Sequence, residues 1–138
     1  MNHQFQDHHD EHEIQMLSIQ SEAKEWEERL SLINEEISFY RDILNSALKE
    51  NVTVSINKEN SKYLKDELQA INKVNEAHLS SFFDYKNKLE GLKECDDVQC
   101  ENFYLKDHLI FKEKLIQHFR TFRALKILIL KYLKMSFS

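Results

Sequence analysis

Histidines are the residues in this chain of 138 residues whose spacing could carry chemistry. His78, His108 and His118 fall on apolar faces of predicted helices, where imidazole commonly binds metal ions or haem. His108 and His118 are ten residues apart on one predicted helix. They are therefore about 15 Å apart along its axis, too far for one ion. A metal site would use His78 with His108, which requires a shift in helix register. We favour the alternative, in which neutral histidines bond to Asn75, a tyrosine hydroxyl or water and fix the register.

The N-terminal segment and the cysteines contain a second group of candidate metal ligands. His8 and His12 are spaced i, i+4, so a helix would point both in one direction. The expected topology brings His12 near the hinge with Cys95 and Cys100, and these four residues are the candidate ligands of a mixed zinc site. The cysteine spacing is uncommon for zinc, so we favour a solvated tail. Both cysteines are expected to be reduced thiols, without a disulfide.

The sequence shows no catalytic motif. Its serines lack a neighbouring base held by a third group, which nucleophilic catalysis requires. One glycine, Gly91, is too few for a phosphate-binding loop. The basic segment 112–134 belongs to a chain of formal net charge −5, which disfavours nucleic acid as a partner. We therefore predict no catalytic residues, no enzyme activity and no cofactor.

Long helices must position these side chains, because one glycine and no proline leave few residues for turns. Apolar residues recur at alternating steps of three and four, the heptad pattern of coiled-coil packing. The first stripe comprises Met16, Ile19, Ala23, Trp26, Leu30, Ile33, Ile37, Tyr40, Leu44 and Ala47. The second comprises Leu64, Leu68, Ile71, Asn75, His78, Phe82, Tyr85, Leu89 and Leu92. The third comprises Tyr104, His108, Phe111, Leu115, His118, Phe122, Leu125, Ile129 and Tyr132.

The predicted fold class is all-α, an antiparallel bundle of three long helices with coiled-coil packing. The helices are expected at about 12–50, 57–93 and 97–135, in one domain at 12–138 that follows a polar, histidine-rich tail at 1–11. Short connections make sequential helices antiparallel neighbours. The first and third helices then run parallel.

Charge and capping residues support this arrangement. Residues 1–50 carry 12 acidic and 4 basic side chains, whereas residues 112–138 carry 1 and 7, so the first and third helices should attract each other. Asp96 or Asp97 can cap the third helix, and Gln99 would complete a capping box that starts at Asp96.

Apolar residues outside the three stripes predict self-association. Leu32, Phe39 and Ile43 widen the apolar face of the first helix. A three-helix core cannot easily bury the surplus width, and monomers rarely expose large apolar patches. The predicted homo-oligomer interface is a further apolar row on the third helix, beside the third stripe. It is formed by Leu105, Leu109, Ile116, Phe119, Leu130 and Leu133. Another protein is the alternative partner.

Two resemblances are visible, and neither implies a functional site. The segment 25–44, EWEERLSLINEEISFYRDIL, resembles helical bacterial proteins of unknown function. The three-helix arrangement resembles spectrin repeats, but the helices here are longer and no internal repeat is present.

The sequence favours a non-catalytic scaffold or protein-interaction module that self-associates. One alternative is a metal- or haem-binding bundle that uses the histidines above. A second, which we disfavour, is binding to a membrane surface by the basic C-terminal helix. The polar, acidic N-terminus does not resemble a signal peptide, and no apolar run reaches the roughly 20 residues of a membrane span, so we expect a cytoplasmic protein.

Overall fold

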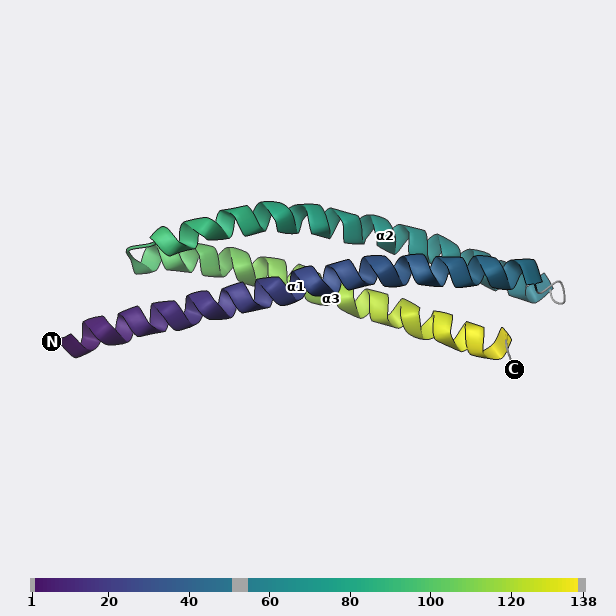
Figure 1. Cartoon of the computed structure of the whole chain (residues 1–138), viewed down its shortest axis with the longest axis horizontal. Coiled ribbons are helices and arrows are strands. Elements are labelled where there is room, and N and C mark those ends of the chain that lie inside the picture. The colour runs from purple at the N-terminus through teal and green to yellow at the C-terminus, as the bar shows by residue number, and fades with distance from the viewer. Residues whose placement is uncertain (1, 51–54, 137–138) are drawn as a thin grey trace.

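Three long α-helices account for most of residues 2–50 and 55–136, the part of the chain whose backbone the computed structural model describes. Side chains are described for residues 11–46 and 59–135. The helices are α1 (Asn2–Glu50), α2 (Ser55–Leu89) and α3 (Val98–Ser136), and a short 3-10 helix, η1 (Glu90–Glu94), follows α2. α2 runs antiparallel to α1 and α3, which run parallel to each other (Figure 1). The predicted all-α class is confirmed.

Two helix boundaries differ from the prediction. α1 begins at Asn2, so the segment 1–11, predicted as a separate tail, continues the helix from its second residue. α2 ends at Leu89 and gives way to the tighter turns of η1 before the third helix begins. The other ends lie within two residues of the prediction.

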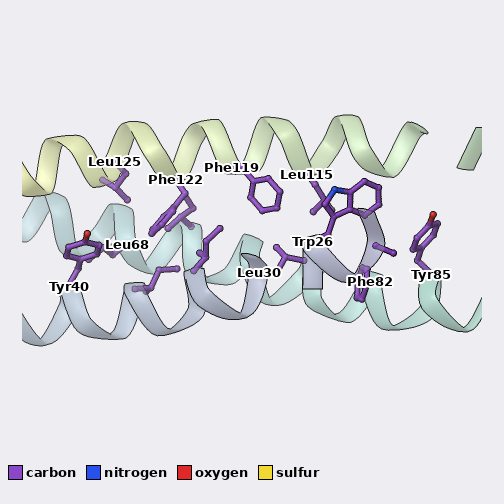
Figure 2. Close-up of a cluster of buried hydrophobic side chains, with 14 of the residues drawn as sticks. Trp26, Leu30, Tyr40, Leu68, Phe82, Tyr85, Leu115, Phe119, Phe122 and Leu125 are labelled. Carbon is purple, nitrogen blue, oxygen red and sulfur yellow. The ribbon is translucent and has the colours of Figure 1, made fainter. Parts of the chain in front are cut away.

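The core follows the three predicted stripes along the rod, and Figure 2 shows side chains from all three helices pointing into it. Leu30, Leu44, Leu115 and Ile129 are fully buried. An aromatic cluster fills the half nearer the α2–α3 hinge, where the rings of Tyr85 and Phe111 stack with centroids 5.1 Å apart. Stripe residues with described side chains are buried, apart from Met16, His78, Tyr104, Phe111 and Tyr132, which are half-buried.

The hinge between α2 and α3 is short and closely packed. A Cβ atom on Gly91 would lie 2.1 Å from the hydroxyl oxygen of Tyr104, so this tyrosine of α3 occupies the space that a side chain would need. Asp97 caps α3, because its Oδ1 accepts a hydrogen bond of 2.8 Å from the backbone N–H of Cys100. The aspartate cap is confirmed, but the capping box from Asp96 to Gln99 is not, because the cap stands one residue later.

α1 and α3 are paired in a parallel register with a constant offset of ninety residues. Glu22 Oε2 lies 2.6 Å from Lys112 Nζ, and Glu36 Oε2 lies 3.0 Å from Lys126 Nζ. The attraction predicted from the charges of these helices is therefore present as two ion pairs. Because both pairs are partly exposed, each contributes at most about 1 kcal/mol, and their main effect is to fix the register.

The further apolar row of α3, predicted as an exposed interface, is corrected in part. Phe119 and Leu133 are each only 8% exposed, and Leu105 is half-buried. The guanidinium of Arg29 on α1 lies 4.0 Å from the centre of the Phe119 ring, so α1 covers this residue. Phe119 and Leu133 belong to the buried core. The exposed members are Leu109, Ile116 and Leu130.

Candidate functional site

A buried polar layer around His118 connects the three helices. Nε2 of His118 on α3 lies 2.8 Å from Oδ1 of Asn75 on α2. Nδ2 of Asn75 donates to the backbone carbonyl of Leu30 on α1 at 3.0 Å. Because an amide oxygen can only accept, His118 donates through Nε2. The ring of His78 lies against that of His118, with centroids 4.8 Å apart. These bonds form only when all three helices hold this register.

Burial keeps the two histidines of this layer neutral. Desolvation lowers the pKa of His118 to about 4, and the nearby His78 adds to the effect. The pKa of His78 is also lowered, first by desolvation and then by the charge of Lys114. Protonating either ring would place a charge in the core, so acid should destabilise the layer.

A second polar layer is built around His108. The hydroxyl of Tyr85 and Nδ1 of His108 form a hydrogen bond, and Nε2 of His108 lies 2.8 Å from Oε1 of Glu22. A carboxylate can only accept, so Nε2 of His108 donates to Glu22. The ring of Trp26 stacks on the imidazole with centroids 4.6 Å apart. This chain of bonds again includes one residue from each helix.

A Tyr–His–Glu chain is a pattern that enzymes use to move protons. Here His108 is 1% exposed and Tyr85 is 7% exposed, whereas the Glu22 side chain is 32% exposed and lines a surface groove together with His108. Burial raises the pKa of Tyr85, with help from the charges of Asp107 and Glu22, and the hydroxyl stays protonated. Burial also acts to raise the pKa of Glu22, but Lys112 and His108 outweigh it and lower that pKa. The layer is suited to holding helices together.

The predicted pairing of His78 with His108 is corrected by the structure. His78 lies against His118, whereas Trp26 and Tyr85 enclose His108. The register differs because η1 and the residues after it lengthen the hinge, so each α2 residue lies level with a later residue of α3. The two bonding partners of the favoured interpretation, Asn75 and a tyrosine hydroxyl, are both present.

The candidate zinc ligands near the hinge are arranged differently from the prediction. Cys95 and Cys100 are joined by a disulfide, which corrects the expectation of reduced thiols and removes the thiolates that zinc would bind. Nδ1 of His12 lies 2.7 Å from Oε1 of Glu101, so His12 does lie close to the hinge. The side chain of His8 lies outside the described residues. Among the described side chains, no three His, Cys, Asp or Glu residues are grouped to hold a metal ion.

A groove between the parallel helices α1 and α3 is the candidate interaction surface. This α1–α3 groove has a volume of about 380 Å³. Its rim includes exposed apolar side chains, among them Leu32 (54% exposed) and Ile116 (38%). Its lining residues are Arg29, Leu32, Ile33, Glu36, Ile116, Phe119, Arg120, Phe122, Arg123 and Lys126. With four cationic side chains and one carboxylate, the groove combines apolar surface with positive charge.

Comparisons with known proteins leave the fold and this groove as the basis for a functional proposal. No family model, curated protein or solved structure matches the chain. Within residues 2–50 and 55–136, no helix is long and apolar enough to cross a membrane.

The sequence reasoning missed the residues that connect α1 to α3 at the edge of the groove. Glu22, Arg29 and Glu36 each contact the residue ninety positions later, through two ion pairs and one cation–π contact. The sequence does contain a signal for these contacts, because the three α1 residues recur every seven positions beside the first stripe. Placing the two helices in a parallel register would have revealed the partners.

Proposed function

We propose that this chain is a non-catalytic interaction module that self-associates through the face formed by α1 and α3. The observation that carries the proposal is the row of exposed apolar side chains on both sides of the α1–α3 groove. Leu32 and Phe39 of α1 are 54% and 59% exposed, and Leu130 of α3 is 48% exposed. Exposed apolar side chains that border a groove are typical of protein interfaces.

The buried polar layers support a structural role for the rest of the bundle. His108, His118 and Asn75 make their hydrogen bonds inside the bundle and hold the register of the helices. A rigid rod of this kind presents its outer faces in fixed positions, which suits a scaffold. The exposed apolar residues beside the groove then provide the contact surface.

The test is light scattering after size-exclusion chromatography on a variant that replaces Phe39 and Leu130 by lysine. We expect light scattering to give a mass above 16.6 kDa for the wild-type chain and the mass of a folded monomer for the variant. Phe83→Lys is the matched control, because Phe83 is a 65% exposed aromatic residue on α2. Equal masses for the wild type and the Phe39→Lys, Leu130→Lys variant would exclude this face as the interface.

A further inference from the structure

The two helices that border the α1–α3 groove carry exposed stripes of opposite charge. On α1 the acidic stripe comprises Glu25, Glu28, Leu32, Glu35, Phe39 and Asp42. On α3 the basic stripe comprises Ile116, Arg120, Arg123, Ile127, Leu130 and Lys134. Both repeat at alternating steps of three and four, so each forms a continuous row along its helix. The charged members of one stripe are all acidic and those of the other are all basic.

These stripes lie on one side of the bundle and at the same level along the rod. Leu32 of the acidic stripe and Ile116, Arg120 and Arg123 of the basic stripe all line the groove. The ninety-residue offset between α1 and α3 places Phe39 almost level with Leu130. At this level each helix presents an apolar residue. By the same offset Leu32 lies level with Arg120 and Arg123, and Glu28 and Glu35 lie within two residues of the levels of Arg120 and Arg123.

We infer that the groove face binds a second copy of this chain across a twofold axis parallel to the helices. This inference rests on the proposed function and deepens it. Rotation about such an axis places α1 of one copy opposite α3 of the other, so each acidic stripe faces a basic stripe. It also brings Phe39 of one copy to Leu130 of its partner. A twofold axis perpendicular to the helices would instead place each stripe against its own copy, and like charges would repel.

Charge reversal tests this arrangement, read out by sedimentation velocity on a dilution series at low salt. We expect Arg120→Glu with Arg123→Glu to weaken the dimer by about tenfold or more, because two cations that face an acidic stripe are replaced by anions. Glu28→Arg with Glu35→Arg should weaken it similarly. Combining the four substitutions should recover much of the dimer, because the charges at these four positions are then exchanged between the stripes. Circular dichroism checks that each variant keeps its helices.

The matched control is Lys62→Glu with Lys73→Glu, which makes the same change in net charge at exposed positions of α2. We expect it to leave the dimer unchanged. A wild-type dimer that survives the reversal of Arg120 and Arg123 would overturn the groove arrangement while self-association stands. A similar weakening by the α2 control would also overturn it.

Two other outcomes would overturn the proposed function together with this inference. One is a wild-type chain that stays monomeric throughout the dilution series. The other is a monomer that floats with phosphatidylserine vesicles and loses this binding on reversal of Arg120 and Arg123. That result would assign the basic stripe to an anionic membrane surface instead of a second copy.

Discussion

His118 and Asn75 are joined by a hydrogen bond of 2.8 Å between Nε2 and Oδ1 inside the bundle, 43 residues apart in the sequence. Asn75 in turn donates to the carbonyl of Leu30 on the first helix. A single amide thus satisfies polar groups from both neighbouring helices. A shift of any helix by one turn would leave buried polar groups without partners, so this residue pair selects one register.

Replacing Asn75 by leucine should destabilise the chain by about 1–3 kcal/mol, because the His118 N–H then loses its acceptor in the core. Adding His118→Leu should recover part of the lost stability, because two leucines leave no buried polar side chain without a hydrogen-bond partner. The free energy of unfolding in urea measures both effects. Asn34→Leu, at an exposed position of α1, serves as the control and should change little. An Asn75→Leu chain as stable as the wild type would contradict the register role.

Acid should destabilise the fold through His118. Folding lowers the pKa of this residue from 6.5 to about 4, so between these values the unfolded chain binds more protons. Stability is therefore full above about pH 6.5 and is lost as the pH falls towards about 4. From about pH 7 to about pH 5 the loss from this residue alone should be about 2 kcal/mol.

The His118→Gln variant isolates that contribution. Its amide can still donate to Asn75 Oδ1, but it does not titrate in this range. Urea unfolding at the two pH values should show a smaller loss for the variant than for the wild type. An equal loss in both chains would assign the acid sensitivity to other groups, such as His78, whose pKa is also lowered.

Gly91→Ala should destabilise the hinge, because the added Cβ would lie 2.1 Å from the Tyr104 hydroxyl oxygen and 3.0 Å from the adjoining ring carbon. We expect a cost of about 1–3 kcal/mol. Combining it with Tyr104→Phe removes the closest atom and should recover part of the loss in thermal unfolding. If the double variant were as unstable as the sum of the single ones, the two residues would not be in conflict.

Removing the disulfide with Cys95→Ser and Cys100→Ser should lower stability by about 2 kcal/mol, the chain-entropy value for a loop this short. Treating the wild type with a reducing agent should have the same effect, and the double-serine variant should not respond to that agent. The dimer mass should persist in both, because the hinge lies outside the groove face. Unchanged wild-type stability under reduction would show that the bond does not contribute.

Much of the fold could be predicted from the sequence, because heptad spacing identifies the buried face of each helix. Leu30, Leu115 and Ile129 lie on the predicted apolar stripes and are fully buried. The width of the buried face on each helix could not be predicted, because it depends on how closely the neighbouring helices cover that face. Phe119 shows this: its neighbour Arg29 is ninety residues away, and only the assembled bundle brings α1 over it.

The candidate site was predicted less well, for two physical reasons. The histidine partners depend on the register across the hinge, and η1 changes that register in a way the apolar spacing does not reveal. The disulfide depends on the local backbone path that brings Cys95 to Cys100, which composition does not specify. By contrast, the exposure of Leu32 and Phe39 could be predicted from their positions beside the first stripe.

Self-association can be tested by sedimentation equilibrium of the wild-type chain at low salt. We expect a mass that rises with concentration from 16.6 kDa to twice that value and no further, as for a closed twofold dimer. A mass of 16.6 kDa at every concentration would contradict it.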